Sequence, residues 1–186
     1  GSGFVFGYVD ANGAQARFNN PVDVASDSSG NLYVADSSNG VIRKIATNGD
    51  VTTVFSFGGA PNGIGIDASD NLYVAGSNSV LFKIKPNGTV TALAGLYLNP
   101  GYVDGVGNAV RFTGGFTVKV DAAGNVFFAD ANANLIRKGE VFSVTSVNPI
   151  AAKPGDTVTI TGRALSAVTA VTFNGVNAAS FTIVSN

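Results

Sequence analysis

An eight-residue stretch, Ser29–Asp36 (Ser-Gly-Asn-Leu-Tyr-Val-Ala-Asp), constrains the fold of this chain more than any other feature. It returns with small changes at 70–76 and at 124–130. A unit that repeats along a chain indicates a repeat architecture, in which each copy forms one supersecondary element. The run Leu-Tyr-Val-Ala is apolar on both faces of a strand, so we expect a sheet that is covered on both sides.

Further short strands surround each copy of this stretch. In the first copy the sequence predicts strands at 22–26, 41–45 and 51–55, with tight turns that contain Gly or Asn. The second copy follows the same plan, and the third lacks a clear fourth strand. Asn31 and Asn71 lie 40 residues apart, and four strands in about 40 residues are typical of a propeller blade. We therefore predict an all-β fold with about three blades, built as four-stranded units.

Two loops of similar sequence occur in the chain, separated by a constant number of residues. Tyr8 and Phe18 recur as Tyr102 and Phe112, in both cases 94 positions later. We interpret these loops as connections between successive blades. Their aromatic side chains either pack between blades, which we favour, or contact a ligand or partner. The candidate contact residues are Tyr8, Asp10, Tyr97, Tyr102 and Asp104.

An acidic and a basic residue also recur at a fixed spacing. Asp36 precedes Arg43 by seven residues, and Asp130 precedes Arg137 by the same number. Two interpretations are open: the pairs hold a ligand at the face of the propeller, or they tie one strand to the next. We favour the structural interpretation, because functional sites seldom repeat from blade to blade.

The residues from Phe18 to Ile45 together resemble the NHL repeat of bacterial β-propellers. The resemblance extends over about residues 4–140 and implies an NHL-like propeller segment at 1–140. The second copy departs from the pattern, because Gly76 stands where the other copies have Asp36 and Asp130. Any role of that Asp is therefore in doubt in the second blade.

The pattern changes after residue 140. The runs Pro154–Gly162 and Ala170–Val176 resemble the start of an IPT/TIG domain, an immunoglobulin-like β-sandwich. The resemblance implies a second segment at 141–186, which is incomplete because such a sandwich needs about 100 residues. We expect the remaining blades and strands to come from the same longer chain or from neighbouring subunits.

The composition argues against most catalytic sites. The chain has no His and no Cys, which removes the commonest general base and a common nucleophile. We therefore predict no catalytic, cofactor-binding or metal-binding residues. Asp27, Asp67 and Asp121 each precede the shared Asn by four residues, and we assign them to tight turns rather than to calcium sites.

Charge and hydropathy exclude two further classes of partner. The net charge is −1 and no basic run occurs, so we expect no nucleic acid partner. No apolar stretch approaches the roughly 18 residues of a membrane helix, so we expect no membrane span. Asn87 and Thr157 lie in short patterns that resemble glycosylation acceptors.

These observations favour a non-catalytic binding or scaffold module of a secreted or cell-surface bacterial protein, with a protein or glycan as its partner. This expectation rests on the resemblance more than on any site. Two alternatives stay open. One is a structural subunit of an extracellular filament or strand-swapped assembly, and the other is a fragment of a propeller hydrolase or lyase.

Overall fold

The computed structural model of the chain describes residues 5–114, 116–122, 124–140, 143–163, 165, 168 and 170–182. The chain divides into two compact units, Gly1–Gly139 and Glu140–Asn186. The described residues form β-strands and single-turn 3-10 helices, so the fold is all-β as predicted. Each unit is described below by itself.

The described residues of the first unit form three antiparallel sheets, which we call blades 1, 2 and 3. In each sheet the strands are ordered as they follow along the chain. Blade 1 consists of β1 (Pro21–Ser26), β2 (Leu32–Asp36), β3 (Val41–Ile45) and β4 (Val51–Ser56). Blade 2 consists of β5 (Pro61–Ile66), β6 (Leu72–Gly76), β7 (Val80–Ile84) and β8 (Val90–Gly95). Blade 3 consists of β9 (Phe116–Val120), β10 (Asn125–Asp130) and β11 (Leu135–Glu140), so only three strands are present there within the described residues.

The first hairpin of each blade closes on the Asp that the sequence assigns to a turn. In blade 1, Asp27 Oδ1 accepts hydrogen bonds from the backbone N–H groups of Ser29 and Asn31 at 3.0 and 2.9 Å. Gly30 adopts a positive φ of 83°, which a residue without a Cβ reaches at low cost. Local hydrogen bonding by the carboxylate thus sets where β1 ends and β2 begins.

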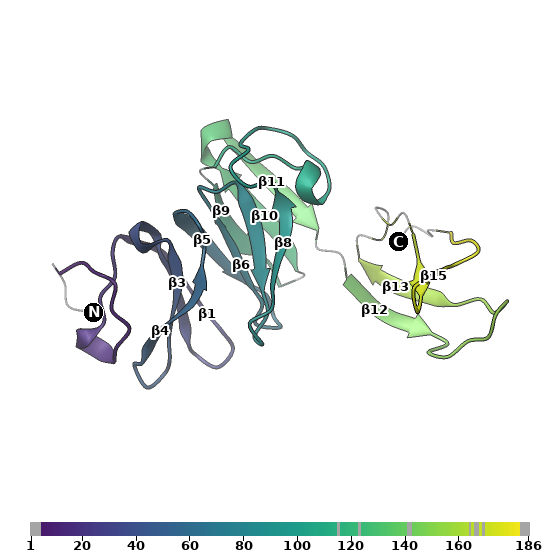
Figure 1. Cartoon of the computed structure of the whole chain (residues 1–186), viewed down its shortest axis with the longest axis horizontal. Helices are drawn as coiled ribbons and strands as arrows, with labels where there is room; N and C mark the ends of the chain where they lie inside the picture. Colours follow the sequence, from purple (N-terminus) through teal and green to yellow (C-terminus); the bar gives the residue numbers. More distant parts are fainter. Residues whose placement is uncertain are drawn as a thin grey trace. The chain divides into compact units, whose positions relative to one another are not determined.

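Successive blades lie side by side in chain order (Figure 1). Their first strands are neighbours, because β1 contacts β5 and β5 contacts β9. The hydrophobic core between blades 1 and 2 comprises the buried residues Ala35, Ile42, Phe57, Ile64, Leu72, Val74 and Ile84. The blades are therefore held together mainly by burial of apolar surface between sheet faces.

Blade 2 lies between the other two blades, and all five residues of β6 are buried. This confirms that a Leu-Tyr-Val-Ala strand is covered on both sides where it has a neighbour on each side. A Cβ built at Gly63 of β5 would lie 2.8 Å from the Thr117 Cα of β9. Glycine at this position therefore permits the close approach of two strands from different blades.

The described residues of the second unit form two small antiparallel sheets. β12 (Ser143–Asn148) pairs with β13 (Thr159–Arg163), and β14 (Thr172–Phe173) pairs with β15 (Val176–Asn177). No helix among the described residues is long and apolar enough to cross a membrane.

Candidate functional site

The loop that precedes blade 1, residues 7–20 and here called loop 1, is held by the guanidinium of Arg43. This side chain is fully buried on β3. Its Nη1 donates to the Arg17 carbonyl at 2.9 Å, and its Nη2 donates to the Val9 carbonyl at 2.8 Å. One side chain thus satisfies carbonyl groups on both arms of the loop, which fixes the loop against the sheet.

Two carboxylates flank the same guanidinium. Arg43 Nη1 lies 3.1 Å from Asp36 Oδ2, and Arg43 Nη2 lies 2.6 Å from Asp10 Oδ1. The rings of Tyr8 and Phe18 also contact it, with the guanidinium carbon 5.2 and 4.9 Å from their centroids. Buried guanidinium groups are stable when such charges and acceptors surround them.

Asp10 and Tyr8 also attach loop 1 to the last strand of the blade. Asp10 Oδ2 accepts the Thr53 N–H of β4 at 2.9 Å, and the Tyr8 hydroxyl lies 3.1 Å from Thr53 Oγ1. The Val51 N–H of β4 donates to the Ala11 carbonyl at 3.0 Å. Loop 1 therefore covers the outer edge of β4, an edge that would otherwise expose unpaired backbone groups.

Loop 2, residues 96–114, repeats this arrangement in front of blade 3. Arg137 of β11 donates to the Arg111 and Val103 carbonyls at 2.7 and 2.8 Å. It contacts Asp104 at 2.6 Å, and its guanidinium lies over the ring of Phe112 with a separation of 5.0 Å. We call these two constellations, centred on Arg43 and Arg137, the arginine anchors.

The anchor of blade 3 is less complete than that of blade 1. Asp36 Oδ2 accepts from Asn39 Nδ2 at 2.8 Å as well as from Arg43. Asp130 Oδ2 is buried without a hydrogen-bond partner, and Arg137 Nη1 lies 3.7 Å from it. Counting from the shared Asn of each repeat, Ala133 occupies the place of Asn39, so blade 3 lacks that donor.

Blade 2 has no arginine anchor. Phe82 takes the place of the arginine, and the rings of Phe55 and Phe57 pack on it with centroid separations of 5.4 and 5.7 Å. A Cβ at Gly76 would lie 2.2 Å from the Ala60 carbonyl oxygen, so no Asp fits there without a shift of the backbone. Only residues 57–60 connect β4 to β5. The anchor therefore accompanies the long loops, and a short link is covered by aromatic packing instead.

The sequence interpretation separated residues that the structure brings together. It placed Tyr8, Asp10 and Asp104 in partner loops and treated the Asp–Arg pairs as a distinct feature. The structure joins them in the two anchors. The sequence contained a usable signal, because the offset of 94 residues that relates the loops also relates Asp36 to Asp130 and Arg43 to Arg137.

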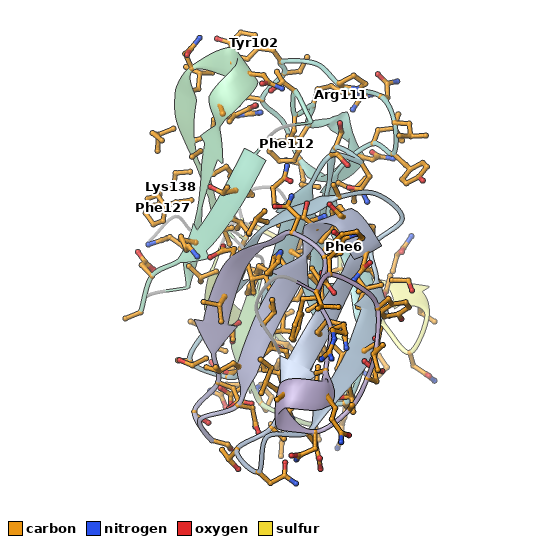
Figure 2. The ribbon with its side chains drawn as sticks, turned by 90° about the vertical axis from the view of Figure 1, so that its left-hand side faces the viewer. Phe6, Tyr102, Arg111, Phe112, Phe127 and Lys138 are labelled. Carbon is orange, nitrogen blue, oxygen red and sulfur yellow. The ribbon has the colours of Figure 1, made fainter. Side chains whose placement is uncertain are left out.

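Loop 2 presents exposed aromatic and aliphatic side chains. Tyr102 is 65% exposed and projects from the end of blade 3, with Phe112 packed beneath the loop (Figure 2). Tyr97 is also exposed, although its hydroxyl donates to the Gly58 carbonyl at 3.0 Å. We call the exposed set on this loop the loop-2 patch, which comprises Leu96, Tyr97, Leu98, Tyr102, Val103 and Val106.

The turn carboxylates lie at the ends of the first strands. Asp27, Asp67, Asp70 and Asp121 contribute to a depression of about 340 Å³. Burial acts to raise the pKa of Asp67, but hydrogen bonds from Asn71, Ser69 and Tyr73 outweigh it, so the pKa lies below its ordinary value of 3.8. No group of three or more His, Cys, Asp or Glu residues in the described part of the chain is placed to hold a metal ion.

The two candidate glycosylation positions lie in connections. Asn87 is exposed in the turn between β7 and β8, where its Oδ1 accepts the Thr89 N–H at 3.0 Å. Thr157 is exposed in the connection between β12 and β13. Modification at either position stays a prediction.

Comparison with known proteins identifies one segment of the chain. Residues 18–45, which contain β1 to β3 of blade 1, match the NHL repeat. The match does not reach 141–186, where the immunoglobulin-like assignment stays a prediction. A search of curated proteins gave no match.

Two solved structures are among those similar to the chain. One is a catalytically inactive virginiamycin B lyase from Staphylococcus aureus with quinupristin, with 12% identity over 68% of this chain and a TM-score of 0.47. Another is a gluconolactonase from Xanthomonas campestris, with 17% identity over 63% of this chain and a TM-score of 0.49. The chain spans 44% and 37% of those two proteins. The family match thus covers the first three strands of blade 1, and the blade-like antiparallel sheets fit a β-propeller fold.

Proposed function

We propose that this chain is a non-catalytic binding module of a secreted or cell-surface bacterial protein, and that it contacts a protein or glycan through its arginine-anchored loops. The observation that carries the proposal is the pairing of buried anchors with exposed side chains. Arg137 fixes both arms of loop 2 through the Val103 and Arg111 carbonyls, while Tyr102 of the same loop remains 65% exposed. A loop that is fixed before binding loses little conformational entropy when a partner arrives.

The chemistry of the loop-2 patch supports this class of partner. Tyrosine is enriched at protein interfaces because its ring buries a large area and its hydroxyl forms hydrogen bonds. A tyrosine ring also stacks on the apolar face of a sugar. Tyr97 and Tyr102 both lie in the patch, and the chain contains no Trp that would compete for this role.

The experiment screens the 186-residue protein against an array of bacterial and plant oligosaccharides and a displayed random-peptide library. Ligands are then titrated by tyrosine fluorescence, which reports on only five Tyr residues in a chain without Trp. We expect Tyr102→Ser to weaken binding at least tenfold. Val176→Ser is the matched control, because Val176 is exposed to a similar degree in the other unit. Binding that is unaffected by Tyr102→Ser, or absent for both libraries, would contradict the proposal.

The enzyme alternative has a separate test. The similar structures include a lyase and a gluconolactonase, and the activities of these two proteins suggest substrates to test. The protein is incubated with gluconolactone and with quinupristin, and conversion is followed by mass spectrometry. Turnover above the uncatalysed rate that is lost on heat denaturation would replace the binding role with an enzymatic one.

A further inference from the structure

Each blade has two faces, and equivalent positions of the repeat identify them. We call the face that carries Val24, Ile64 or Val118 the leading face. The opposite face, which carries Ile42, Leu81 or Ile136, is the trailing face. The three residues of each face occupy the same position of the repeat. The count from the shared Asn and the pairing of the strands both establish this.

Within the chain, trailing faces pack on leading faces. Ile42 of blade 1 and Ile64 of blade 2 are both 0% exposed in the core that joins these blades. Leu81 of blade 2 and Val118 of blade 3 are likewise buried, where β5 and β6 contact β9. In both contacts between blades, a trailing face therefore packs on the leading face of the next blade.

Among the described residues of the first unit, two faces of the same kinds have no neighbouring blade. Ile136 on the trailing face of blade 3 is 76% exposed, although its equivalents are buried. Val24 on the leading face of blade 1 is 54% exposed, although Ile64 and Val118 are 0% exposed. The residue type does not explain the difference, because large apolar side chains occupy these positions in every blade; they are exposed where no described blade packs on them.

We propose that a second copy of this chain covers both faces. The trailing face of blade 3 in one copy packs on the leading face of blade 1 in the other, and the reverse contact closes the ring. Both halves of one known interface occur on a single chain, so two copies complete each other head to tail. Two sets of three blades give six, which lies within the four to eight that a closed propeller contains.

The first strands of the blades, β1, β5 and β9, indicate which interface within the chain the proposed interface between copies resembles. Blade 2 has Gly63 and Gly65, whose lack of a Cβ lets β9 approach closely. Blade 3 has Thr117 and Lys119 at the equivalent positions, so this close approach is not available there. The interface between copies therefore resembles that between blades 1 and 2, where Ala25 stands at the place of Gly65.

The side chains around Ile136 fit this role. Phe127 takes the place that Tyr33 and Tyr73 hold on the trailing faces of blades 1 and 2. Tyr73 is fully buried and Tyr33 packs against the core, whereas Phe127 lies at the margin of blade 3 together with Lys138 (Figure 2). An aromatic ring thus accompanies the exposed isoleucine on the free trailing face.

Sedimentation of the 186-residue protein over a range of concentrations tests the proposal. We expect a species of twice 18.8 kDa that dissociates on dilution. Ile136→Asp and Val24→Asp should each weaken association at least about 100-fold, because either places an unpaired charge in the buried interface. Ile150→Asp is the matched control, because Ile150 is 95% exposed in the other unit, and it should associate normally; circular dichroism verifies the fold of each variant.

Mixing the two variants distinguishes head-to-tail pairing from pairing of a face with itself. Ile136→Asp keeps an intact leading face, and Val24→Asp keeps an intact trailing face. A mixture should therefore form a mixed dimer through one intact interface, at concentrations where each variant alone is monomeric. A monomer at every concentration, an open series of larger species, normal association of Val24→Asp, or no mixed dimer would each overturn the proposal.

Discussion

Asp36 and Asp130 occupy the same place in two blades, yet only Asp36 Oδ2 has hydrogen-bond donors. It accepts from Asn39 and Arg43, whereas Asp130 Oδ2 is buried without a hydrogen-bond partner. Desolvating a charged oxygen without compensation costs free energy. Two contacts differ: Ala133 stands in place of Asn39, and Arg137 Nη1 lies 3.7 Å from Asp130 Oδ2, beyond hydrogen-bond distance.

Replacing Ala133 with Asn should therefore stabilise blade 3. The amide would donate to Asp130 Oδ2 as Asn39 does to Asp36, and a hydrogen bond to a buried charge contributes about 1 to 3 kcal/mol. We expect a higher midpoint of urea unfolding for Ala133→Asn. The control is Ala131→Asn, which adds the same amide at an exposed position of the same turn. Equal midpoints for Ala133→Asn and Ala131→Asn would contradict this account.

At the scale of the element, each blade depends on an Asp that organises its first hairpin. Asp67 accepts the Ser69 and Asn71 N–H groups, the Asn71 amide and the Tyr73 hydroxyl. Burial raises the pKa of the Tyr73 hydroxyl most, and the nearby Asp67 carboxylate raises it further. These contacts favour the charged form of Asp67 in the folded protein.

This gives the hairpin a defined pH dependence. The pKa of Asp67 is lower in the folded chain than its ordinary value of 3.8. The stability that the charged group contributes is therefore complete above that value and is lost as the pH falls through the folded pKa. We expect the wild type to exceed Asp67→Asn in free energy of unfolding at pH 6, with a gap that narrows below about pH 4. Urea unfolding from pH 7 to pH 2 measures this difference in free energy of unfolding. A difference that does not change with pH would contradict a stabilising role for the charged Asp67 carboxylate.

The contact between β5 and β9 gives a prediction about packing between elements. In Gly63→Ala the new Cβ would lie 2.8 Å from the Thr117 Cα and the Val118 N, both backbone atoms. Overpacking of this kind typically costs about 1 to 3 kcal/mol, so the midpoint of urea unfolding should fall. Gly105→Ala is the control, because its Cβ would lie 3.3 Å from the Ala109 methyl group and no closer than 3.5 Å to a backbone atom. Equal effects of the two substitutions would show that the blades do not approach as described.

At the scale of the whole molecule, association links stability to concentration. If two copies close one ring, the folded dimer is favoured by mass action and its unfolding midpoint rises with protein concentration. We expect this rise in thermal unfolding of the wild type and of the control Ile150→Asp. Ile136→Asp should show a midpoint that does not change with concentration. A rise that persists in Ile136→Asp would place the contact elsewhere on the molecule.

Much of the fold could be predicted from the repeat. Strand β3 was expected at 41–45 and spans Val41–Ile45, because alternation and the flanking turns are local signals. The sequence also indicated the Asp turns and both long loops. It did not show that Arg43 reaches across 34 residues to the Val9 carbonyl, since no local pattern specifies which acceptor a long side chain will find.

By itself, the sequence determined the period, the strands and the hairpin turns of this protein, because these depend on neighbours within a few residues. The tertiary structure alone decided which equivalent positions are buried. Isoleucine occupies the same position of the repeat in blades 1 and 3, yet Ile42 is 0% exposed and Ile136 is 76% exposed. Burial is a property of the neighbouring blade, and only the assembled sheets show where a neighbour is present and where the next one would pack.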